Sequence, residues 1–147
     1  MRVSIAGLAC IRRVGLAGPE YLTQWSERWG MYSLVGGHVE EGETFRACCV
    51  REVEEELELT PGVGFAVAER PLRPEVEYVA MSGGSKVETR YRVELFVVEL
   101  LTPEAMAAVN ANPANRWLTV AEIAAGTTID GQPISAQVKT VFTLNGV

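Results

Sequence analysis

The sequence has few of the features that define several common classes of protein. It contains one histidine and three cysteines, and it has no CxxC pair or Cys/His cluster, which argues against a zinc site. No run of lysine and arginine exceeds two residues, so the basic face of a protein that wraps a nucleic-acid polymer is missing. The longest apolar run near the N-terminus, Val3 to Ile11, is too short to span a membrane.

The cysteines and the overall composition indicate a folded protein of the cytoplasm. Cys10, Cys48 and Cys49 are odd in number and two are adjacent, a pattern that favours reduced thiols in a cytoplasmic protein. Apolar residues make up 48% of the chain and charged residues 22%, which argues against disorder. The length of 147 residues predicts a single domain over residues 1–147.

The negative charge is concentrated in one stretch of the sequence. Between Glu40 and Glu58 there are eight glutamates against two arginines, which gives 2 − 8 = −6 and equals the net charge of the whole chain. The remaining eleven basic and eleven acidic residues cancel. A local excess of this kind is typical of a cation site rather than of a generally acidic surface.

The pattern of apolar and turn-forming residues predicts a mixed α+β fold. Residues 44–57 lack glycine and proline and predict a helix, with Ala47, Val50, Val53 and Leu57 on its apolar side. Strands are expected on both sides of this helix without a steady βαβ rhythm, which favours a layered α/β/α arrangement around a mixed sheet. The expected strands are 2–12, 21–25, 31–35, 64–70, 75–81 and 87–101, with a loop at 36–43, a turn at 82–85, and further helices at 103–110, within 117–126 and at 135–145.

Three glutamates of the predicted helix fall on one face. Because successive residues turn by about 100°, Glu55 lies about 60° to one side of Glu52 and Glu56 about 40° to the other. Like charges at these spacings destabilise a helix by a few tenths of a kcal/mol per pair. A hard cation such as Mg²⁺ or Mn²⁺ would reverse that cost, although an acidic face exposed to solvent is an alternative interpretation of the helix alone.

Residues 37–59 resemble the Nudix box, G-x5-E-x7-R-E-U-x-E-E-x-G-U, in which U is a bulky aliphatic residue. Gly37 is followed at the family spacing by Glu43, and the segment "REVEEELEL" (51–59) supplies the arginine, the glutamates and the aliphatic positions. Glu58 stands where the family has its second glycine. That glycine usually ends the helix, so its loss leaves two outcomes: the helix continues, or the turn before residues 60–62 is strained.

The resemblance implies a Nudix fold and a set of site residues. It implies that Glu52, Glu55 and Glu56, with the carbonyl group of Gly37, bind Mg²⁺ or Mn²⁺. It also implies that Glu52 or a later glutamate acts as the base, and that the remaining box residues, Glu43 and Arg51, pair to hold the loop against the helix. Outside the box, Glu94 is a further candidate ligand, since relatives often recruit another carboxylate.

The implied activity is the hydrolysis of a diphosphate linkage in a nucleoside diphosphate joined to another moiety, or in a nucleoside triphosphate. The expected partner is then a small nucleotide, and neither a nucleic-acid polymer nor a membrane is expected. A homodimer is possible, because homodimers are frequent among relatives. Three alternatives stay open: a non-catalytic Nudix-fold nucleotide sensor, an isomerase on the same fold, and an acidic interaction domain. Intact glutamates favour the enzyme over the sensor, and an isomerase would need protonating residues, for which only Cys10 and His38 are available.

Overall fold

The computed structural model of the protein describes residues 1–81 and 86–147. The turn expected at 82–85 lies outside the described residues. The elements are β1 (Arg2–Gly15), β2 (Gly18–Ser26), β3 (Met31–Leu34), β4 (Gly36–His38), α1 (Phe45–Leu57), β5 (Phe65–Val67), β6 (Val76–Met81), β7 (Glu88–Leu100), α2 (Pro103–Ala111), β8 (Asn115–Thr119), α3 (Val120–Ala125) and α4 (Ala136–Leu144).

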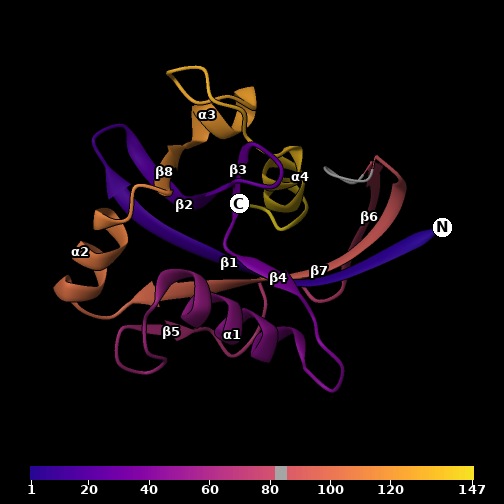
Figure 1. Ribbon diagram of the computed structural model, residues 1–147, viewed down its shortest axis with the longest axis horizontal. Coiled ribbons are helices and arrows are strands. Elements are labelled where there is room, and N and C mark those ends of the chain that lie inside the picture. Colours follow the sequence, from indigo (N-terminus) through magenta and orange to yellow (C-terminus); the bar gives the residue numbers. More distant parts are fainter. Residues whose placement is uncertain (82–85) are drawn as a thin grey trace.

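Strand β1 organises the sheet. It runs parallel to β7 over ten residue pairs, from Arg2 opposite Thr89 to Ile11 opposite Val98. Its other edge pairs antiparallel first with β4 and then with β2. The order along the sheet is β3-β2-β1-β7-β5, with β6 on β7 and β8 on β2 (Figure 1). Parallel and antiparallel pairs therefore occur together, as the expected mixed sheet requires.

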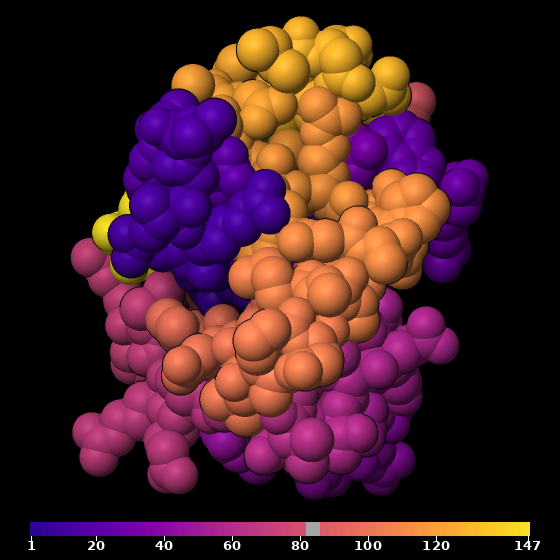
Figure 2. All heavy atoms as spheres, turned by 90° about the vertical axis from the view of Figure 1, so that its left-hand side faces the viewer, coloured from indigo at the N-terminus to yellow at the C-terminus, as the bar shows by residue number. Residues whose placement is uncertain are grey.

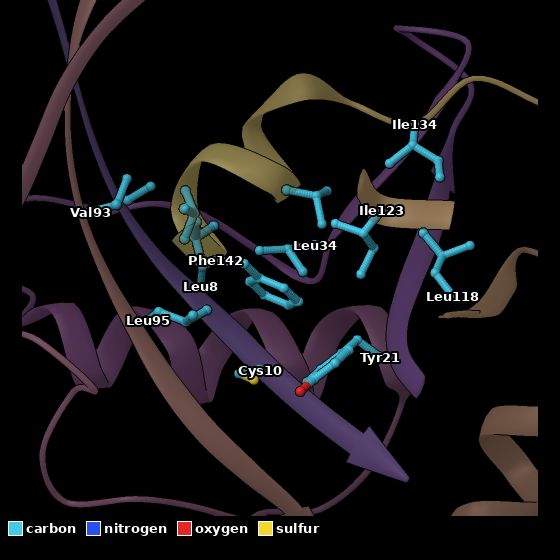
Figure 3. Packing of buried hydrophobic residues seen from close by; sticks show 13 residues of the cluster. Leu8, Cys10, Tyr21, Leu34, Val93, Leu95, Leu118, Ile123, Ile134 and Phe142 are labelled. Carbon is cyan, nitrogen blue, oxygen red and sulfur yellow. The ribbon is translucent and has the colours of Figure 1, made fainter. Parts of the chain in front are cut away.

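Helices cover both faces of this sheet, so the predicted α/β/α layering is confirmed. In Figure 1, α1 lies on one side of the β1–β7 pair, and α3 and α4 lie on the other. The core on the α3/α4 side includes Leu8, Leu95, Phe142 and nearby side chains (Figure 3). The core on the α1 side includes Val53 and Phe96. Side chains along β1 and β7 point alternately into the two cores, because successive residues of a strand face opposite sides of the sheet.

The remaining elements close the end of the molecule near α2. Figure 2 shows the segment from α2 to β8 lying across the surface between the β1–β2 hairpin and α1. Among the helices of residues 1–81 and 86–147, none has both the length and the apolar character needed to cross a membrane.

Two expectations about the α1 region are wrong in detail. Residues 36–38 were expected in a loop, but they form β4, because each pairs with a residue of β1. Ala47 was expected on the buried side of the helix, but it is exposed, whereas Cys48 and Cys49 are fully buried. The first turn of α1 lies directly against β1 at Gly7, and small thiol side chains fill that narrow contact.

Candidate functional site

Helix α1 begins and ends at defined signals. At its start, the Thr44 side chain caps the helix by accepting a hydrogen bond from the Ala47 amide, at 3.0 Å. At its end, Glu58 adopts the left-handed conformation, with φ 53° and ψ 43°. Of the two outcomes left open by the missing glycine, the structure shows the second: the helix stops at Leu57, and a non-glycine residue occupies a turn that favours glycine.

Replacing Glu58 with glycine is expected to stabilise the protein. A side chain in the left-handed region costs about 1 kcal/mol or more, and the greater freedom of glycine in the unfolded chain offsets part of the gain. The net effect should be about 0.5–1 kcal/mol, or a rise in Tm of about 1.5–3 °C. Calorimetry measures it, with Glu58→Ala as the control, because alanine removes the charge but keeps the backbone strain. An unchanged or lower Tm in Glu58→Gly would contradict this account.

Three glycines allow the loop, strand and helix to come unusually close. A methyl group on Gly37 would overlap Glu52 Oε1 and lie 2.6 Å from Glu52 Cδ. A methyl group on Gly7 would overlap the Phe45 carbonyl oxygen, and one on Gly36 would overlap the Gly7 carbonyl oxygen. The Glu52 carboxylate therefore rests against the backbone of β4, which fixes its position relative to the loop.

Arg51 connects the loop to the helix. Its guanidinium group binds the Glu43 carboxylate through two hydrogen bonds, of 2.8 and 3.0 Å, and also contacts Glu52 Oε1 at 2.9 Å. A fourth contact, of 3.1 Å, reaches the His38 carbonyl oxygen. The hydrogen bonds from Arg51, together with one from the Glu40 backbone amide, hold the pKa of Glu43 down at about 2. Glu43 therefore stays ionised and keeps Arg51 in place.

The carboxylate of Glu56 lacks a positive partner among the described residues. Its Oε2 accepts a weak hydrogen bond from the Gly36 amide, at 3.3 Å, and its neighbour is the negatively charged Glu52. Burial first, and repulsion from Glu52 second, raise the pKa of Glu56 to about 8. In the part of the chain that the structure describes, the ionised form of Glu56 has no positively charged neighbour to stabilise it, and a bound cation would provide one.

The structure brings Glu52 and Glu56 together but turns Glu55 outwards. The Glu55 side chain is 59% exposed and lies 3.5 Å from Arg51. Within residues 1–81 and 86–147, no three acidic, histidine or cysteine side chains are gathered closely enough to hold a metal ion as they stand. The donor chemistry nevertheless fits a hard divalent ion, because the Glu52 carboxylate lies beside the partly buried, uncompensated carboxyl group of Glu56. Glu55 would complete the set by a rotation of its exposed side chain.

Of the two other candidates, Gly37 lies against Glu52, whereas Glu94 lies on the far side of β1. The Gly37 carbonyl oxygen accepts a hydrogen bond from the Cys48 thiol, at 3.2 Å. In the sheet, Gly7 of β1 pairs with Gly37 of β4 on one edge and with Glu94 of β7 on the other edge. Glu94 and Gly37 therefore lie on opposite sides of β1. The first turn of α1 covers Gly7 and stands between them. Glu94 instead accepts a hydrogen bond from the Glu75 amide, at 2.9 Å.

Sequence reasoning missed residues that shape the site from other elements. Gly7 and Gly36 permit the close packing of strand and helix. Gln24 of β2 donates a hydrogen bond to the Glu56 carbonyl oxygen, at 3.2 Å, and another to Asn115, at 2.9 Å. A glycine within an otherwise β-branched or aliphatic strand signals a close backbone approach, so Gly7 could have been found. No local pattern indicates Gln24, because its partners are distant in the sequence.

Comparison with known proteins agrees with the fold and the box. The family model described as the NUDIX domain matches residues 10–138. No curated protein sequence matches the chain significantly. The chain belongs to the Nudix family. As a member of this family it is classed with the Nudix hydrolases.

Solved structures show the same fold at low sequence identity. An Ap4A hydrolase from C. elegans is 17% identical, with a TM-score of 0.66 over 98% of this chain and 96% of that chain. A MutT protein from Methanosarcina mazei Go1 is also 17% identical, with a TM-score of 0.60 over 99% and 94%. NrtR from Shewanella oneidensis, solved in complex with a 27mer DNA, is 13% identical, with a TM-score of 0.64 over 96% of this chain and 59% of that chain.

Proposed function

We propose that the protein hydrolyses the diphosphate linkage of a nucleoside diphosphate joined to another moiety, or of a nucleoside triphosphate, in the cytoplasm. The observation that carries the proposal is the Glu52–Glu56 pair, held against the Gly36–Gly37 backbone with no positive partner at Glu56. An ion pair with Arg51 satisfies Glu52 on one side only. The pair therefore suits a ligand that brings positive charge with it.

The residues proposed to hold Mg²⁺ or Mn²⁺ are Glu52, Glu55 and Glu56, with the Gly37 carbonyl group. When bound, such an ion neutralises phosphate oxygens and lowers the pKa of a water molecule. The chain's own carboxylates then take the proton as the water attacks phosphorus, and cleavage of the anhydride releases two phosphorylated halves. Glu43 contributes indirectly, because it holds Arg51, which in turn orients Glu52.

The decisive test is a panel of nucleotide diphosphates and triphosphates with Mg²⁺ or Mn²⁺, followed by release of phosphate or of a mononucleotide. Turnover of at least one compound in a metal-dependent reaction is expected. Metal binding without turnover across dozens of compounds would favour a nucleotide sensor. The structural likeness to NrtR, which was solved bound to DNA, is the observation that keeps this second function in view.

Divalent ions should bind more tightly as the pH rises. The pKa of Glu56 is raised from 4.5 to about 8, so the stability that the protonated group contributes is fully present below about pH 4.5 and is lost as the pH passes through about 8. Without metal, the Tm should therefore fall between about pH 5 and pH 9, and the rise in Tm on adding Mg²⁺ should be larger at the upper end.

Glu56→Gln is the control for this pH dependence, because an amide does not titrate. The variant should flatten the metal-free profile and weaken the Mg²⁺ effect at high pH. A metal-free Tm that changes with pH in the same way in both proteins would assign the effect to other groups. Thermal scans in chelator, with and without added Mg²⁺, provide both measurements.

A further inference from the structure

A row of three uncharged polar side chains crosses the sheet beside helix α1. Ser33 of β3 lies opposite Gln24 of β2, and Gln24 lies opposite Asn115 of β8. All three are partly buried, and we call them the polar row. Gln24 is two residues from Leu22, which belongs to the α1-side core, so the polar row faces the same side of the sheet as α1.

The polar row adjoins the last turn of α1, which carries Glu56. The side-chain amide of Gln24 donates a hydrogen bond of 3.2 Å to the backbone carbonyl oxygen of Glu56. The carboxylate of Glu56 accepts a hydrogen bond from the backbone amide of Gly36, which follows Ser33 by three residues. A substrate whose diphosphate lies at Glu56 can therefore extend onto the polar row.

The hydrogen bonds of the polar row leave two groups for a ligand. The amide nitrogen of Gln24 serves both the Glu56 carbonyl oxygen and, at 2.9 Å, Asn115 Oδ1. Both of these oxygens can only accept, so the side-chain oxygen of Gln24 is directed away from them. Within the described ranges 1–81 and 86–147, neither that oxygen nor the Ser33 hydroxyl bonds another group of the protein, and neither is sealed from solvent.

The chemistry of this face suits an uncharged planar ring. No charged residue stands in the polar row or in the next pair along the same face, which is Ser26 opposite Met31. Met31 is partly buried and offers polarizable apolar surface. Beside it, the Gln24 oxygen accepts a hydrogen bond and the Ser33 hydroxyl can donate one. A nucleobase has an apolar face and carries donors next to acceptors along its edge, so it can use all three groups at once.

We propose that the polar row binds the nucleobase of the substrate, with Gln24 and Ser33 at the edge of the base and Met31 against its face. The inference rests on the proposed function, because it assigns the nucleoside end of that substrate to the side of Glu56 that β2 and β3 form. Asn115 is a positioning residue, because it acts through Gln24, whose orientation it fixes.

Isothermal titration in Mg²⁺ compares nucleoside monophosphates with ribose 5-phosphate, which has the phosphate and a sugar but no base. The probes are the 5′-monophosphates of adenosine, guanosine, cytidine and uridine, which contain no anhydride to hydrolyse. At least one of them should bind ~10-fold or more tightly than ribose 5-phosphate, at one site per chain. Two hydrogen bonds and an apolar contact depend on the base and account for the difference.

Ser33→Ala is the sharpest variant, because the hydroxyl that it removes has no partner among the described residues and the bonds of Gln24 are kept. It should weaken binding of that nucleotide about three- to tenfold, in line with loss of one neutral hydrogen bond, and leave binding of ribose 5-phosphate unchanged. Thr143→Ala is the matched control, since it removes an exposed hydroxyl from α4 on the other side of the sheet. The control should keep the wild-type affinity, and thermal scans of the three proteins check that the fold is kept.

Two results would overturn the proposal: no nucleotide binds more tightly than ribose 5-phosphate, or Ser33→Ala keeps the wild-type affinity. Backbone amide shifts on titration provide the location, and the shifts that the base adds to those of ribose 5-phosphate should centre on Ser33, Gln24 and Met31. Additional shifts confined to another part of the chain would equally refute it.

Binding and turnover together separate this inference from the proposed hydrolysis. Turnover of a nucleotide without any preference for the base refutes the role of the polar row and leaves the hydrolysis intact. A preference for a base without turnover of any compound supports the polar row, and it refutes the hydrolysis in favour of the nucleotide sensor.

Discussion

Replacing Glu56 with glutamine is expected to lower turnover at least ~10²-fold while the protein remains folded. Glutamine has almost the same shape as glutamate and can still accept the hydrogen bond from the Gly36 amide, which is 3.3 Å long in the protein. It cannot supply the negative charge that a divalent ion needs at this position. The measurement is kcat with the best compound of the substrate panel at saturating Mg²⁺.

The same variant, Glu56→Gln, is expected to be more stable than the wild-type protein although it is less active. Because burial and Glu52 disfavour the ionised form of Glu56, the neutral amide should make the metal-free protein more stable at pH 8. Lower activity together with higher stability would show that the negative charge of Glu56 serves function and not the stability of the fold. Glu54→Gln is the matched control, since Glu54 lies on the same helix, is exposed and points away from Glu52. Wild-type rates in Glu56→Gln would refute its assignment as a metal-binding residue.

The helix and its box could be predicted from the sequence because their signals are local. The absence of glycine and proline from residues 44–57, and the i, i+3 and i+4 spacing of the glutamates, depend only on neighbours along the chain. The end of the helix was ambiguous for the same reason: Glu58 gives no stop signal. The structure ends α1 there because Leu57 and Leu59 both contribute to the α1-side core, and Pro61 disfavours helical geometry at the residue before it.

The contacts between elements could not be predicted, because they depend on register. Glu94 had the right chemistry for a ligand, yet the pairing of β1 with β4 and β7 sets Glu94 and Gly37 on opposite sides of Gly7. The burial of Cys48 and Cys49 in place of Ala47 follows from the same contact, since Gly7 brings the helix down onto β1. The mixed sheet with helices on both faces was predictable as a class, but the alignment of its strands was not.

Replacing Gly37 with alanine is expected to reduce turnover about 10²-fold with little loss of stability. The added methyl group would overlap Glu52 Oε1 and lie 2.6 Å from Glu52 Cδ, so the carboxylate must move. Only the end of a flexible side chain has to yield, which costs far less than moving backbone. A displacement of about 1 Å at a reacting centre can by itself cost ~10²-fold in rate. The measurements are kcat at saturating Mg²⁺ and the Tm in chelator.

Gly7→Ala supplies the contrast, because its methyl group would overlap the backbone oxygen of Phe45 and push the helix away from β1. Overpacking of this kind typically costs about 1–3 kcal/mol, so this variant should lose stability first. A double-mutant cycle then tests the stated cause of the Gly37→Ala effect. If the methyl group acts only by moving Glu52, Gly37→Ala should cause no further loss when Glu52 is already glutamine. A full additional ~10²-fold loss in the double variant would show that the methyl group acts on something other than Glu52, and the close contact between the loop and this carboxylate would then not be what organises the site.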